Sequence, residues 1–124
     1  MEIITSETAP PAVGPYSHAV RVGHLIFCSG QIPIDPATKE IVPGGIHEQT
    51  QQVLRNIQAV LATANLTLAN VVKATVFLTD LRDFPVVNGL YASAFGDHKP
   101  ARSTLGVAAL PLGAKVEIEV IAEA

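Results

Sequence analysis

Near its carboxyl end, this 124-residue chain places one arginine and two glutamates on predicted strands that are otherwise mostly apolar. Arg102 opens a predicted strand over residues 102–108, and Glu117 and Glu119 lie in another over residues 116–122. An arginine can hold a carboxylate through two parallel N–H bonds, and a neighbouring carboxylate can orient water and carry protons. The pattern by itself favours a cross-strand ion pair on a solvated face. The alternative is an arginine that binds an anion beside a carboxylate that performs acid–base chemistry.

The turn between these two strands decides whether the three charged side chains meet. Side chains alternate between the two faces of a strand. If Pro111 and Leu112 occupy the two central positions of the turn, strand pairing places Arg102, Glu117 and Glu119 on one face. We therefore expect a hairpin with a shared charged face, which a turn one residue longer or shorter would undo.

The length and composition of the chain limit the classes of protein to which it can belong. A chain of this size is expected to form one domain over residues 1–124. A formal charge of -3 with only eight Lys and Arg argues against a nucleic-acid partner. No apolar run is long enough for a membrane span and no signal peptide is evident, so we expect a cytoplasmic protein. The plentiful aliphatic residues suit a subunit that hides surface in an oligomer.

Other reactive side chains give weaker signals. Cys28 is the only cysteine, and its apolar neighbours favour a buried, inert thiol. The four histidines lack metal-ligand spacing, so no metal site is expected. Ser17 and Ser29 show no nucleophile–base pairing, which argues against a serine hydrolase.

The pattern of elements predicts an α+β fold in the order β-β-β-α-β-α-β-β. Strands at both ends and only two helices indicate a mixed sheet with both helices packed on one face. Apolar residues at three- and four-residue spacing predict the first helix over residues 46–64, which Asn65 ends. Asp83 is expected to cap the second helix, with Pro85 in its first turn. The predicted strands before the charged pair cover residues 2–5, 17–22, 25–29 and 71–79.

Several motifs, in order along nearly the whole chain, resemble those of one protein family. They are GPYS from residue 14, SGQIP from 29, VKATVFL from 72 with DL at 80, DF at 83 with VN at 87, PARS from 100 and VEIE from 116. As a set they are specific, and by them the chain resembles the RidA subgroup of the Rid (YjgF-type) family of reactive-intermediate deaminases.

This resemblance implies a chorismate-mutase-like fold that assembles as a homotrimeric barrel, with one site in each of three clefts between subunits. It implies hydrolysis of 2-imino acids such as 2-iminopropanoate and 2-iminobutanoate, and of their enamine tautomers, to 2-oxo acids and ammonia. It also implies that the reaction uses no metal and no organic cofactor.

The resemblance assigns roles residue by residue. The carboxylate-binding arginine of the family falls on Arg102, and the acidic residue that holds the attacking water falls on Glu117, although Glu119 on the same predicted face stays open for that role. The positions that line the pocket fall on Tyr16, Ser29, Gly30, Asn88 and Thr104. The chain departs from the family at Thr104, where many relatives have cysteine, and in a shorter loop over residues 95–100.

Three other functions fit some of these features. A non-catalytic trimer could sense 2-oxo acids or amino acids through the same arginine. A chorismate-mutase-like enzyme would share the scaffold, but it would need several cations in the cleft where only Arg102 stands out. A ribonuclease or translation inhibitor is disfavoured by the acidic charge balance and by the lack of a basic, aromatic stripe.

Overall fold

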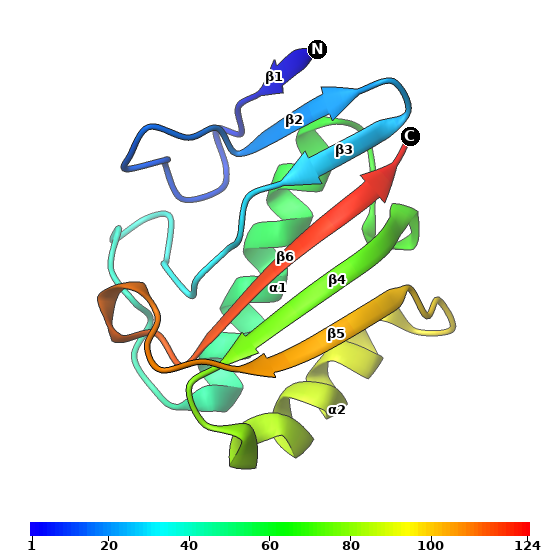
Figure 1. Ribbon diagram of the computed structural model, residues 1–124. Coiled ribbons are helices and arrows are strands. Elements are labelled where there is room, and N and C mark those ends of the chain that lie inside the picture. Colours follow the sequence, from blue (N-terminus) through cyan, green and yellow to red (C-terminus); the bar gives the residue numbers. More distant parts are fainter.

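A six-stranded mixed sheet runs through the molecule in the order β1-β2-β3-β6-β4-β5, as the computed structural model of residues 1–124 shows (Figure 1). Neighbouring strands are antiparallel except β4 and β5, which are parallel. The strands are β1 Glu2–Ile4, β2 Ala19–Val22, β3 Leu25–Cys28, β4 Val71–Leu78, β5 Ala101–Gly106 and β6 Val116–Glu123.

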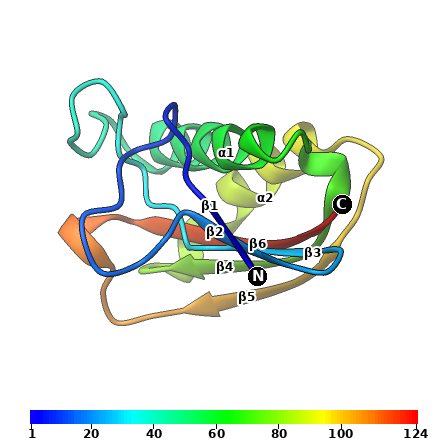
Figure 2. The same cartoon turned by 90° about the horizontal axis from the view of Figure 1, so that it is seen from above.

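Two helices, α1 (Ile46–Thr63) and α2 (Phe84–Phe95), cover one face of this sheet and leave the other open (Figure 2). The predicted order of elements and the α+β class are therefore confirmed. Asn65 follows α1 with a positive φ of 59°, the conformation that ends helices. Asp83 makes no side-chain cap. Instead, Asp80 accepts from the Arg82 N–H at 2.9 Å and caps the short 3-10 helix η2 (Leu81–Asp83), which leads into α2.

The core lies between the sheet and the helices. It is a continuous cluster of 21 buried apolar residues, to which α1 contributes Val53, Ile57 and Leu61 and the central strands contribute Val76 and Ile118. Burying each such side chain stabilises the fold by about 1.5–3 kcal/mol. The central strands β4 and β6 are therefore a rigid platform for side chains on either face.

The predicted hairpin between the last two strands is wrong, because β4 lies between β5 and β6. The connecting segment crosses the end of β4: Val107 N–H donates to the Leu78 carbonyl at 2.8 Å, and Thr79 N–H donates to the Lys115 carbonyl at 3.2 Å. β4 is rich in β-branched and buried residues, which suits a central position better than the mostly exposed β5 does. The turn itself is a short 3-10 helix, η3 (Pro111–Gly113).

This topology separates the charged residues that the hairpin was expected to bring together. Ala74 of β4 is paired with Arg102 on one side and with Val120 on the other, and all three face the helices. Phe77 is paired with Glu117, which therefore lies on the open face. Within one chain, Arg102 and Glu117 are on opposite faces of the sheet.

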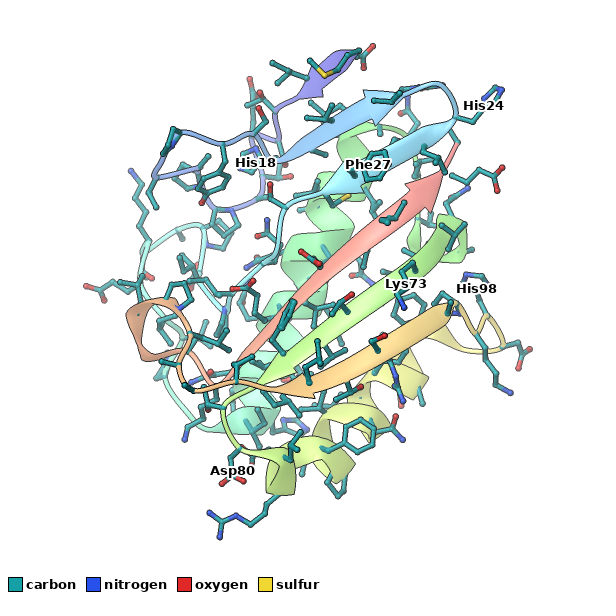
Figure 3. The ribbon with its side chains drawn as sticks, viewed as in Figure 1. His18, His24, Phe27, Lys73, Asp80 and His98 are labelled. Atoms are coloured by element: carbon teal, nitrogen blue, oxygen red, sulfur yellow. The ribbon has the colours of Figure 1, made fainter.

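The open face exposes large apolar side chains on strands β3 and β5. Leu25, Phe27 and Leu105 keep 40%, 44% and 46% of their surface exposed. Phe27 and Lys73, which both pair with Ile121, lie on this face (Figure 3). A face of this kind suits contact with another protein surface better than contact with water.

Candidate functional site

The Arg102 guanidinium rests on helix α2. Phe84, Asn88 and Tyr91 are four and then three residues apart, so they lie on one side of this helix. The Arg102 Cζ atom is 5.3 Å from the centroid of the Phe84 ring and 4.8 Å from that of Tyr91. Arg102 Nη1–H donates to Asn88 Oδ1 at 2.8 Å. We call these three residues the α2 cradle.

Every partner of Arg102 in the cradle is neutral. The two ion pairs of the chain, His47–Glu48 and Arg82–Asp80, lie elsewhere. The alternative of a cross-strand ion pair at Arg102 is therefore wrong within this chain. Two aromatic faces and one amide orient the guanidinium and leave its charge unneutralised, which suits it to bind an external anion.

A cleft of about 390 Å³ opens beside Arg102, between the second half of α2 and the loop that leads to β5. We call it the arginine cleft. His98 fixes this loop, because its Nε2 lies 2.6 Å from the Val71 carbonyl oxygen at the start of β4 (Figure 3). The lining residues are Asn88, Tyr91, Ala92, Phe95, Gly96, His98, Lys99, Pro100 and Arg102.

A second cleft, of about 600 Å³, lies at the end of the sheet where β6 begins, and we call it the glutamate cleft. Tyr16, Ser29, Gly30, Glu117 and Glu119 all line it. Four of these, all but Glu119, are site residues that the family resemblance implied. The amino-terminal loop, the segment after β3 and strand β6 each contribute to the cleft.

The close approach of two backbone segments positions Glu117. Gln31 and Ile118 exchange backbone hydrogen bonds of 2.9 and 3.2 Å, which hold Gly30 against β6. A Cβ atom at Gly30 would lie 2.5 Å from Glu117 Oε2, too close for any real contact. Glycine at position 30 is therefore what allows the Glu117 carboxylate to lie in the cleft.

Glu117 differs from its neighbour Glu119 in its surroundings. Glu117 is half-buried and forms no ion pair, and burial, with a smaller contribution from the charge of Glu119, raises the pKa of Glu117 above its usual value. Glu119 is exposed. A carboxyl group with a raised pKa exchanges protons more readily near neutral pH, so the geometry favours Glu117 over Glu119 for proton transfer.

Ser29 and His18 hold the loop that forms one wall of the glutamate cleft. The Ser29 hydroxyl donates to the Ser17 carbonyl, which uses its only donor. The buried His18 ring accepts from the Ser6 N–H at 2.9 Å and donates to the Pro10 carbonyl at 2.7 Å (Figure 3). Tyr16 projects from this anchored loop with 51% of its surface exposed, beside the cleft.

The structure therefore places the predicted site residues in two groups. Tyr16, Ser29, Gly30 and Glu117 share the glutamate cleft, whereas Arg102 and Asn88 share the arginine cleft. Thr104 is paired with Val76 on the helix side of the sheet, on the same face as Arg102, and lines neither cleft. One group offers an anion-binding cation and the other a proton-carrying acid, and neither offers both.

Three residues of the arginine cleft are not evident as site residues from the sequence. Tyr91 is expected there only as part of an apolar stripe, although the spacing of Phe84, Asn88 and Tyr91 already indicates a shared side of the helix. His98 and Lys99 carry no such signal, because their place in the cleft depends on how the loop folds back on β4.

Cys28 behaves as expected. It is partly buried against the core, and burial raises the pKa of its thiol to about 11, so the thiol stays protonated and weakly reactive at neutral pH. No three His, Cys, Asp or Glu side chains gather in a way that could hold a metal ion. None of the helices is long and apolar enough to span a bilayer.

Comparisons with known proteins agree on one family. A family model described as Endoribonuclease L-PSP matches residues 6–124. The 2-iminobutanoate/2-iminopropanoate deaminase of Bos taurus is 50% identical over 121 residues, which are 98% of this chain and 88% of the relative.

Two solved structures are also similar. RidA from an Antarctic Psychrobacter species is 44% identical with a TM-score of 0.96, and the match covers 100% of both chains. TdcF of Escherichia coli, solved with bound serine, is 42% identical with a TM-score of 0.95, and the match covers 100% of this chain and 99% of that one.

Proposed function

The chain belongs to the Rid family, which the Endoribonuclease L-PSP model describes, and on this premise we propose that it is a hydrolytic deaminase of 2-imino acids and their enamine tautomers. The products would be a 2-oxo acid and ammonia, with 2-iminopropanoate and 2-iminobutanoate as the simplest substrates. The observation that carries the proposal is the Arg102 guanidinium, held on two aromatic rings with no acidic partner and open to a cleft. The printed name of the Bos taurus relative supports the same activity.

We further propose that the working site forms between subunits of a homotrimer. Arg102 and Glu117 cannot meet within one chain because they lie on opposite faces of the sheet. The exposed apolar residues of the open face supply a surface for contact between copies. In this arrangement Arg102 of one protomer lies near the glutamate cleft of its neighbour.

In the proposed reaction Arg102 binds the substrate carboxylate through two N–H bonds and so fixes the plane of the adjacent C=N group. Glu117 takes a proton from water as the water oxygen bonds to the imine carbon, and it passes this proton to nitrogen. The result is a 2-amino-2-hydroxy acid. Glu117 then moves the hydroxyl proton to nitrogen, the C–N bond breaks, the C=O bond forms, and ammonia leaves. Acid–base help of this kind accelerates a reaction by about two to four powers of ten.

The remaining predicted residues shape the site. Asn88 orients the guanidinium by accepting a hydrogen bond from its Nη1, and Gly30 leaves space for the Glu117 carboxylate. Tyr16 and the loop that Ser29 anchors enclose the substrate. Thr104 contributes through its backbone, which any side chain retains. A cytoplasmic location and a reaction without a cofactor stay predictions from the sequence.

The test couples an amino-acid oxidase or dehydratase to this protein and follows the loss of the released imine. Wild type should accelerate the loss, and Arg102→Ala should abolish the acceleration while the protein stays folded and assembled. Near-normal turnover by Arg102→Ala would contradict the proposal. The second candidate is a non-catalytic sensor, which the serine bound to TdcF favours. A sensor would bind 2-oxo acids or amino acids without accelerating imine loss.

A further inference from the structure

The arginine cleft contains a second cation that the proposed reaction does not use. Lys99 lines this cleft together with Arg102, and neither residue forms an ion pair. No Asp or Glu lines the cleft, although the chain has 11 acidic residues against 8 Lys and Arg. Asp97, two residues before Lys99, is exposed and lies outside the lining. Two positive charges without partners therefore border one cleft.

The loop that carries Lys99 is held in place on both sides. His98 contacts the Val71 carbonyl at 2.6 Å and packs its ring 6.3 Å from that of Phe95. Pro100 follows immediately and restricts the backbone. The backbone at Lys99 is therefore held beside the cleft that Lys99 lines, and its flexible stem leaves the ammonium group free to reach a bound anion.

The cleft is larger than a four-carbon imino acid requires. Its volume of about 390 Å³ equals the share of about a dozen water molecules in the liquid. A monocarboxylate would use Arg102 and leave Lys99 without a partner. A substrate with a second carboxylate at the far end of its side chain would use both cations and more of the volume.

We propose that this chain prefers 2-imino dicarboxylates, such as the imines of aspartate and glutamate, over the small monocarboxylates. The inference rests on the proposed deaminase function and concerns the same site. Arg102 holds the carboxylate next to the imine, and Lys99 holds the distal carboxylate. Because an ammonium group on a flexible stem is a point charge without a fixed plane, it accepts side chains of either length.

The experiment compares kcat/KM for 2-iminosuccinate and 2-iminoglutarate with that for 2-iminobutanoate, each released in place by the matching amino-acid oxidase. Wild type should prefer the two dicarboxylates. Lys99→Gln should lower kcat/KM for them about five- to tenfold and change 2-iminobutanoate less than about twofold. Lys99→Arg should retain the preference. The matched control is Lys115→Gln, which removes the same charge from an exposed position outside both clefts and should change neither substrate class.

Binding supplies a readout that does not require turnover. Measured by calorimetry, Lys99→Gln should weaken the binding of 2-oxoglutarate and leave the binding of 2-oxobutanoate unchanged. Equal losses for both classes, or a wild type that prefers 2-iminobutanoate, would overturn the dicarboxylate inference while the deaminase function stands. If no imine is consumed faster than without protein, the deaminase function fails instead, and the binding comparison still decides the role of Lys99.

Discussion

Glu117 is a carboxylate whose position costs stability and favours proton transfer. Burial and the charge of Glu119 raise its pKa, so the folded protein binds a proton there more tightly than the unfolded chain does. Folding stability is therefore lost as pH rises from the unfolded pKa through the raised folded pKa. Because burial disfavours the charged carboxylate, the ionised form of Glu117 is a better proton acceptor than an exposed glutamate.

The first prediction concerns the pH dependence of turnover. Because the ionised form of Glu117 is needed, kcat/KM should fall as pH falls through the pKa of Glu117, which lies above the ordinary glutamate value. Glu119→Gln removes the smaller cause of the raised pKa of Glu117. The acidic limb of the profile, which is the fall in kcat/KM at low pH, should therefore move to lower pH. Because burial is the larger cause, the limb should stay above the ordinary value.

Glu123→Gln is the control for this profile, since it removes an exposed carboxylate at the far end of the same strand. Its profile should match wild type, and comparing variants on one substrate cancels the pH dependence of the imine itself. An acidic limb that does not move in Glu119→Gln would show that Glu117 does not set the profile.

The second prediction concerns Gly30. Gly30→Ala places a Cβ atom 2.5 Å from Glu117 Oε2, so the carboxylate must move away. A displacement of about 1 Å at a reacting group can lower kcat about 100-fold. Thermal unfolding should show that the fold survives, because the carboxylate is on a side chain that can turn.

Gly89→Ala provides a matched control within helix α2. It adds the same methyl group where nothing lies within 4 Å. It should raise the free energy of unfolding by about 0.5–1 kcal/mol and leave kcat unchanged, since alanine is the better helix former. Equal activity in the two variants would mean that the position of Glu117 is not critical.

At the scale of elements, helix α2 orients the arginine. The third prediction is that Phe84→Leu removes one aromatic face from beneath Arg102 and raises KM about fivefold with little change in kcat, because the carboxylate is held less firmly. Tyr91→Phe keeps the ring under the guanidinium and should leave KM unchanged. The Tyr91 hydroxyl is buried without a partner, so its removal should leave stability unchanged or raise it by up to about 1 kcal/mol.

Steady-state kinetics and thermal unfolding of these two variants check the cradle. If Tyr91→Phe raises KM as much as Phe84→Leu does, the hydroxyl rather than the rings would be the group that matters.

Prediction from the sequence succeeds for the helices and strands that have a strong local pattern. Helix α1 and strand β4 have strong apolar periodicity or β-branched runs, and the structure has both at the predicted places. The predicted pairing of β5 with β6 is wrong. The short turn at Pro111 indicates that the chain reverses, but it does not reveal that β4 lies between the two strands that the turn connects. Strand order depends on the burial of β4 along its whole length, a non-local property.

At the scale of the whole molecule, the open face of the sheet is the surface through which copies of the chain are expected to assemble. The fourth prediction is that the protein is a trimer in solution and that Phe27→Glu, in the middle of this face, dissociates it and abolishes turnover. Burying a charge without a partner in such an interface costs several kcal/mol. Light scattering after size exclusion measures the mass, and Gln58→Glu, on the exposed side of α1, adds the same charge as a control.

A fully active wild-type monomer would contradict the trimer. The family resemblance predicted Arg102 and Asn88, which line the arginine cleft, and Tyr16, Ser29, Gly30 and Glu117, which line the glutamate cleft. The sequence could not place these two groups of residues relative to each other. That arrangement depends on β5 and β6 lying on either side of β4 and on a neighbouring copy, and neither is visible in local spacing.

The most direct measurement mixes two inactive proteins. Arg102→Ala and Glu117→Gln subunits, dissociated and reassembled at equal amounts, should regain about one quarter of wild-type activity, because about three quarters of random trimers are mixed and each has one intact site. A mixture that forms mixed trimers by mass yet stays as inactive as its components would contradict a site shared between Arg102 of one subunit and Glu117 of the next.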